Sequence, residues 1–170
     1  MSAARPGLVI EPLTRAAFAP YGEVVDTSGM VPQAINGGTA ARYSPLAQVE
    51  VVGDDAGRGA VLGIYRAQPR RLPLPLLELE RHPLGSQAFV PLQPGRYLVV
   101  VSGNAAEPTP SDVRVFLAVG QQGVSLRAGV WHHALLALDR ESDFLVVERA
   151  SAAANLELRA ISAWELSIDG

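Results

Sequence analysis

The stretch ERHPLGSQAFVPL, residues 80–92, places polar side chains directly before an apolar run in a chain that is otherwise hydrophobic. The run QAFVPL, bounded by turn residues, predicts a strand. Proline and glycine ahead of it permit a tight corner, which brings Glu80, His82 and Gln87 toward one point. A strand needs none of these groups for packing. The stretch therefore indicates a functional site at the edge of a β-structure.

Similar apolar runs recur along the whole chain, and glycine or proline separates them. They are GLVIEPL, LAQVEVV, AVLGIYRA, RYLVVVSG, VRVFLAVG, GVSLRAG, HHALLAL and DFLVVERA. Runs of this length between turn residues predict strands, and their regular spacing is typical of a sandwich or barrel. The 13 prolines argue against long helices. We therefore predict one all-β domain of antiparallel strands that covers residues 1–170.

Three local signals refine this prediction. Thr14 can cap a short helix, which should end before Pro20 because the residue ahead of a proline avoids the helical region. A second short helix is predicted near residues 162–166. Asn36 and Gly37 predict a hairpin turn.

Composition limits the classes of function. With 170 residues, 48% hydrophobic and 18% charged, the chain is typical of one folded domain. A net charge of −3 gives no basic surface for nucleic acid. The chain has no cysteine, which excludes thiolate metal sites and fits a reducing compartment. It shows neither a signal-peptide pattern nor an apolar run of about 20 residues. We expect a cytoplasmic protein with no membrane partner.

A second polar segment, RAGVWHHALLAL at residues 127–138, contains the other two of the three histidines. Gly129 permits a turn before it. If a strand follows, His132 shares one face with its neighbours two positions away, and His133 faces the opposite side. Imidazole titrates near the working pH, so these side chains suit acid–base chemistry as well as metal binding.

The two polar segments, about 50 residues apart, resemble the two motifs of the cupin superfamily, His-x-His with a later Glu and Gly-x-x-His. Glu80, His82 and Gln87 match the first motif, and Gly129 with His132 matches the second. This chain departs from the first motif at two positions. Glu80 occupies the position of the first histidine, and Gln87 occupies that of the glutamate. Two imidazoles and a carboxylate still suit a divalent ion. An amide in place of a carboxylate implies that the ion is held loosely.

A closer resemblance extends over about residues 10–150. The segments PLTRAAFAPYGEVVD, INGGTAARY, YRAQP, ERHPLGSQAFVPL, GVWHH and DFLVVER, in this order, resemble the ureidoglycolate lyase family, also called ureidoglycolate hydrolase. The resemblance implies a cupin-type antiparallel β-barrel (jelly roll) with one or two short helices, and a homodimer. It implies cleavage of (S)-ureidoglycolate into glyoxylate and urea in allantoin and purine breakdown. It also implies a divalent metal, nickel preferred, with zinc or manganese as alternatives.

Candidate roles follow for each polar residue. The carboxylate of ureidoglycolate is best bound by an arginine, whose guanidinium can donate two parallel hydrogen bonds to it. Arg66 ends a predicted strand, and Arg42 lies beside the predicted hairpin turn. The full set comprises catalytic Glu80, His82, His132 and His133, substrate-binding Arg66, Arg42 and Gln87, and the metal ligands His82, Gln87, His132 and Glu80.

Plainer interpretations stand beside these. A buried histidine often only completes a hydrogen bond, Glu80 could form a buried ion pair, and an arginine at a strand end is commonly a surface residue. Two other functions also remain open. One is a hydrolase that releases ammonia from the ureido group. The other is a non-catalytic cupin that binds a ureide, which the degenerate metal motif favours.

Overall fold

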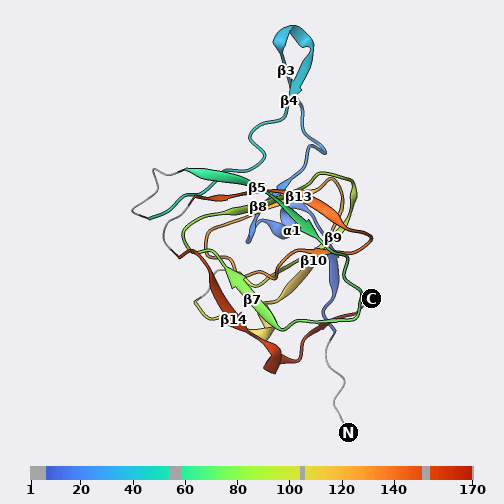
Figure 1. The fold of residues 1–170 in the computed structure, drawn as a ribbon. Coiled ribbons are helices and arrows are strands. Elements are labelled where there is room, and N and C mark those ends of the chain that lie inside the picture. The colour runs from blue at the N-terminus through green and yellow to red at the C-terminus, as the bar shows by residue number, and fades with distance from the viewer. Residues whose placement is uncertain (1–6, 54–58, 104–105, 151–153, 170) are drawn as a thin grey trace.

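The computed structural model describes residues 7–53, 59–103, 106–150 and 154–169. Its strands form two main sheets, with the orders β1-β10-β9-β12 and β2-β11-β8-β13-β5 (Figure 1). The bounds in the first sheet are β1 Ile10–Pro12, β10 Arg114–Gly120, β9 Gly95–Val101 and β12 Leu136–Ala137. Those in the second are β2 Gly22–Val25, β11 Gly123–Leu126, β8 Gln87–Pro91, β13 Ser142–Arg149 and β5 Ala60–Ala67.

Two hydrophobic cores explain why strand β9 is apolar at every position from Tyr97 onward. Tyr97, Val99 and Val101 point into a core that side chains of both main sheets share. Leu98 and Val100 point into a second core on the other side of the four-stranded sheet. Successive strand residues face opposite sides, so a strand with both faces covered loses the alternation of polar and apolar residues. The four-stranded sheet is therefore the middle layer of the domain.

The outer layer over the second core consists of short elements from residues 74–81 and 157–168. They are β6 Leu74–Pro75, β7 Glu78–Arg81, β14 Glu157–Ala160, the 3-10 turn Ser162–Trp164 and β15 Ser167–Ile168. β14 pairs with β7, and β15 pairs with β6. The predicted helix near residues 162–166 is thus a single 3-10 turn.

The N-terminal helix and the hairpin follow their local signals. Helix α1 spans Arg15–Phe18, and the Thr14 hydroxyl accepts a hydrogen bond from the Ala17 N–H at 3.2 Å. β3 Gln33–Ile35 and β4 Ala40–Arg42 form the hairpin around a 3-10 turn at Asn36–Gly38. Its Asn36 and Gly37 have φ values of 53° and 68°, the left-handed backbone that these residue types tolerate. Both predictions are confirmed.

The prediction of an all-β fold is confirmed, with two differences of detail. The described strands form two facing sheets rather than one closed ring. β1 also pairs with β10 in parallel, and after β1 the chain passes through α1 into β2 of the other sheet. In the part of the chain that the structure describes, no helix has the length and apolar character needed to span a membrane.

Candidate active site

The two polar segments lie side by side through backbone pairing. The Glu80 N–H donates to the His132 carbonyl at 2.7 Å, and the His132 N–H donates to the Glu80 carbonyl at 2.8 Å. The predicted strand at residues 130–138 is wrong in extent, because only Leu136–Ala137 is a strand. His132 makes isolated bridges to Glu80 on one side and to Val101 of β9 on the other. Those bridges hold it between β7 and β9.

Three potential ligand side chains converge at this point. The His132 Nε2 lies 3.4 Å from the Glu80 Oε1. The His82 Nε2 lies 4.0 Å from the same oxygen. One ligand atom from each of Glu80, His82 and His132 lies within 4.8 Å of the other two. Because a metal–imidazole bond is about 2 Å long, nitrogens this close can share one ion.

Backbone carbonyls orient both imidazole rings. The His82 Nδ1 lies 2.7 Å from the Asn155 carbonyl oxygen, and the His132 Nδ1 lies 3.0 Å from the Val130 carbonyl oxygen. A carbonyl oxygen only accepts, so each Nδ1 carries a hydrogen and each Nε2 faces the cluster. The His82 Nε2 is buried with no hydrogen-bond partner among the described residues. This is how metal-ligating histidines are usually anchored.

The Gln87 side chain contacts the cluster through His132, and Glu148 orients its amide group. Its Nε2 donates to the Glu148 Oε2 at 2.9 Å, which leaves its Oε1 3.2 Å from the His132 Nε2. The Tyr65 hydroxyl donates to the other Glu148 oxygen at 3.0 Å. Neither Tyr65 nor Glu148 is among the site residues predicted from the sequence. The signal that could have found them is the register of β8 with β13, which places Gln87 opposite Glu148.

The pKa values of Glu80 and of the neighbouring His133 are both lowered, for different reasons. A hydrogen bond with His132 lowers the pKa of Glu80 despite partial burial, and the nearby imidazoles add to this effect. Burial lowers the pKa of His133, whose Nδ1 lies 2.9 Å from the Ala134 carbonyl oxygen. At neutral pH, Glu80 is thus a carboxylate and His133 is an uncharged imidazole. The site can accept a proton at either group.

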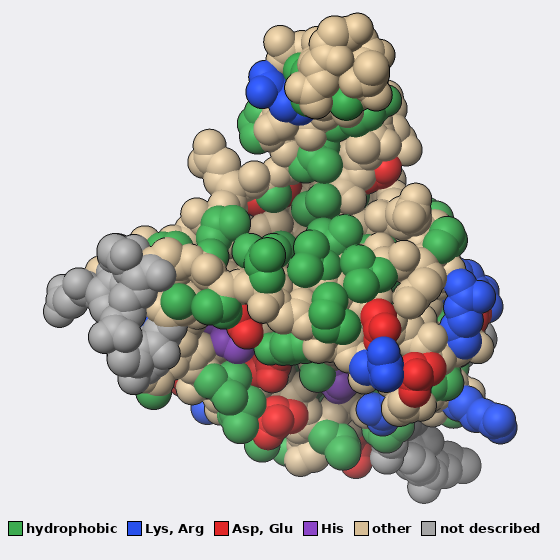
Figure 2. Space-filling view, turned by 45° about the horizontal axis from the view of Figure 1, so that its top comes forward, with side chains coloured by type: hydrophobic (Ala, Val, Ile, Leu, Met, Phe, Trp, Pro, Cys, Tyr) green, Lys and Arg blue, Asp and Glu red, His purple; other side chains and the backbone are tan. Residues whose placement is uncertain are grey.

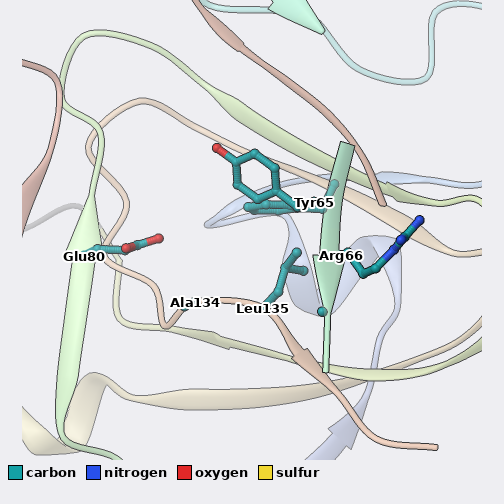
Figure 3. A pocket seen from close by; sticks show the side chains of 7 residues that line it. Tyr65, Arg66, Glu80, Ala134 and Leu135 are labelled. Atoms are coloured by element: carbon teal, nitrogen blue, oxygen red, sulfur yellow. The ribbon is translucent and has the colours of Figure 1, made fainter. Parts of the chain in front are cut away.

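A pocket of about 510 Å³, part of it open to solvent, lies next to the cluster. Figure 3 shows the Glu80 carboxylate pointing into it from one side, Tyr65 above it and Leu135 below. Its lining residues are Tyr65, Arg66, Ala67, Glu80, Phe89, Ala134 and Leu135. His132 and His133 line a smaller hollow bordered by the same Phe89 and Leu135. The pocket is thus mostly apolar with a few polar groups directed inward, as small-molecule sites are.

The structure does not bring either candidate arginine into the cluster. The Arg66 Nε and Nη2 donate to both carboxylate oxygens of Asp143, at 2.7 and 2.9 Å. Figure 3 shows the Arg66 side chain turned away from the pocket. Arg42 lies on β4 and donates to Gln33 within the same hairpin. That hairpin projects from the body, far from β7 (Figure 1).

Comparisons with known proteins identify the family of the chain. The family model described as Ureidoglycolate lyase matches residues 5–168. A protein from Brucella anthropi named Ureidoglycolate lyase is 49% identical over 150 residues, which are 88% of this chain and 87% of that protein. One of the same name from Burkholderia mallei is 51% identical over 149 residues, 88% of this chain and 86% of the relative. A third, from Azotobacter vinelandii, is 47% identical over 88% of this chain and 89% of its own length. The chain belongs to the ureidoglycolate lyase family.

Proposed function

We propose that this protein is an enzyme that cleaves (S)-ureidoglycolate into glyoxylate and urea. The relatives' shared name supports the reaction. The observation that carries the proposal for this chain is the convergence of Glu80, His82 and His132 within 4.8 Å beside an open pocket. A carboxylate and two oriented imidazoles supply a base and an acid at one place, which this cleavage needs.

The proposed reaction moves one proton from oxygen to nitrogen. Ureidoglycolate has its hydroxyl and its ureido nitrogen on one carbon. Glu80 accepts the hydroxyl proton, and the O–H electron pair forms the C=O of glyoxylate. The C–N bond breaks toward nitrogen, and His82 or His132, protonated on both ring nitrogens, donates its Nε2 proton as urea leaves. Each positioned acid or base contributes roughly 10²–10⁴ in rate.

The residues present also fit a divalent metal. Glu80, His82 and His132 would hold it, with the Gln87 amide oxygen as a fourth ligand. The His82 Nε2 supports this assignment, because it is buried without a hydrogen-bond partner among the residues that the structure describes. When bound, the ion supplies Lewis-acid polarisation of a substrate oxygen. We propose nickel first, and zinc or manganese as alternatives, since imidazole nitrogens suit such ions. An amide ligand makes the binding weak and exchangeable.

The proposal also covers the metabolic pathway, the cellular location and the oligomeric state of the enzyme. We propose a role in allantoin and purine catabolism, because ureidoglycolate is a ureide of that route. We propose a cytoplasmic location, which the absence of cysteine favours. We also propose a homodimer, which the uncovered apolar surface around β5 supports.

The experiment that tests the proposed function identifies the nitrogen product. The purified protein, with and without added Ni²⁺, is given (S)-ureidoglycolate, and urea and ammonia are measured against spontaneous decay. We expect urea with no ammonia, and a rate above the uncatalysed one. Ammonia as the product would instead show an amidohydrolase. No turnover with either metal state, together with binding of the ureide, would show a non-catalytic binding protein.

A further inference from the structure

One long part of the chain is folded without any buried side chain. We call residues 27–49 the arm; they include the β3–β4 hairpin. All of residues 25–53 are described, and none of them is buried. Figure 1 shows the hairpin projecting well beyond the two sheets. A two-stranded hairpin is marginal by itself in water, and ordering a segment costs conformational entropy that burial must offset. The arm therefore needs a surface to lie on.

A matching surface lies at the base of the arm. β5 is the outermost strand of its sheet, and none of its eight residues is buried. Its exposed apolar side chains, with the exposed fraction of each residue, are Val61 45%, Leu62 72%, Ile64 55% and Tyr65 42%. Figure 2 shows hydrophobic side chains gathered in one patch below the hairpin, with histidine and acidic side chains at its lower margin. We call this surface, which is formed by side chains on both sides of the edge strand β5, the β5 face.

The β5 face borders the candidate active site. Tyr65, Arg66 and Ala67 belong to β5 and also line the pocket. A free sheet edge with apolar side chains readily pairs with another chain. Whatever covers the β5 face therefore comes next to the pocket mouth.

Charge indicates which partner fits. The arm has a single charged side chain, Arg42, and exposed Val31 (94%) is its most accessible large apolar residue. Acidic side chains lie near the β5 face. Glu80 lines the pocket, and Asp143 and Glu148 lie on adjoining β13. Glu141 lies 3.7 Å from the Arg66 Nε. The one arginine among the pocket-lining residues is held by Asp143. The pocket thus has no uncommitted guanidinium of its own among the described lining residues, although its proposed substrate carries a carboxylate.

We propose that a second copy of this chain covers the β5 face, and that its arm places Arg42 at the pocket, where the guanidinium binds the carboxylate of the substrate. A two-fold dimer makes the contact reciprocal, so that each arm lies on its partner's β5 face and each pocket receives one Arg42. The apolar arm residues then become buried, and this burial offsets the entropy cost of folding the hairpin. This inference rests on the proposed function and deepens it, because the site is complete only in the dimer.

Subunit complementation tests the arrangement directly. Arg42→Ala removes the guanidinium of the arm, and Glu80→Gln disables the body of the site. Each homodimer should have little activity at low substrate concentration; for Arg42→Ala this should be a rise in KM of about tenfold or more, because a charge-assisted hydrogen bond is lost. The two variants are then co-expressed with different affinity tags, and the mixed dimer is purified.

The mixed dimer contains one intact site only if the arm acts on the partner. In that case its activity should rise to about half that of the wild-type dimer. If Arg42 acts within its own chain, the mixed dimer shows only the average of the two parent homodimers, and the proposal is overturned. A wild-type protein that releases no urea would defeat the proposed function instead, whatever the subunit arrangement.

Association is tested separately from activity. Leu62→Asp, on the β5 face, should shift the protein to monomer in sedimentation equilibrium and raise KM. Val119→Asp is the matched control, since Val119 is 47% exposed on β10, away from the β5 face. Arg70→Ala is the control for arginine, because Arg70 is exposed and its charge reaches His133. An active wild-type monomer, or a KM effect of Arg70→Ala without one of Arg42→Ala, would refute the proposal.

Discussion

Strands β9 and β5 are both rich in apolar residues, but their surroundings differ: one strand is buried and the other is exposed. GRYLVVV of β9 has five consecutive buried residues, whereas AVLGIYRA of β5 has none. β9 lies between two cores, and β5 lies at the edge of its sheet with both faces largely exposed. Apolar β-branched residues thus predict a strand in both places but do not say what covers it. In β9 the cover comes from the same chain, and for β5 we infer that it comes from another.

The largest expected effect is on the free energy of unfolding, when the same leucine-to-alanine substitution is made in β9 and in β5. Leu98 in β9 is 2% exposed, and Leu62 in β5 is 72% exposed. Leu98→Ala should lower the free energy of unfolding by about 2–5 kcal/mol, because it leaves a cavity in a packed core. Leu62→Ala should change the stability of the monomer by roughly 0.5 kcal/mol or less. Urea unfolding at low protein concentration measures both, and equal losses would contradict the contrast.

The next effect concerns catalysis by the cluster, whose His132 lies beside the buried strand β9. Glu80→Gln and His132→Ala should each lower kcat about 10²-fold or more, which is at least about 2.7 kcal/mol of transition-state stabilisation. The reason is that both side chains act on the bond being broken. Urea release measures kcat, and circular dichroism confirms folding. Near wild-type kcat in His132→Ala would show that the cluster is structural only.

A smaller effect follows from the pKa of Glu80. Its folded pKa is lowered from the ordinary value of 4.5, chiefly by the hydrogen bond with His132. Such a group stabilises the fold above its unfolded pKa, and that contribution disappears as pH falls through the folded pKa. The stability advantage of the wild type over Glu80→Gln should therefore be present at pH 7 and shrink below about pH 4.5. Urea unfolding across pH 7 to 3 measures it, and an advantage that grew in acid would contradict the assignment.

The smallest expected effect is that of metal removal on the fold. Backbone pairing and carbonyl contacts already position Glu80, His82 and His132 without an ion. A metal present near its dissociation constant adds only about 0.4 kcal/mol to the free energy of unfolding. A chelator should therefore abolish any metal-dependent activity while the cooperative thermal transition stays. Loss of that transition would show that the ion is structural, as in a zinc finger.

Several features of the molecule could be predicted because their causes are local. The Thr14 cap depends on a hydroxyl and the next turn of chain. The Asn36–Gly37 turn depends on backbone conformations that those two residues tolerate. The approach of Glu80, His82 and Gln87 depends on strand alternation and a short corner. Short-range sterics and hydrogen bonding decide such features, so the residue types themselves contain the information.

Other features were decided by tertiary structure, because they depend on which distant segments become neighbours. The pairing of β8 with β13 places Glu148 where it orients Gln87. The loop carbonyl of Asn155 orients His82, and Asp143 across the β5–β13 pair holds Arg66 away from the pocket. These contacts join residues about 60 to 80 positions apart. They follow from how whole sheets bury their apolar faces, a choice that the chain makes collectively and that no single stretch of sequence contains.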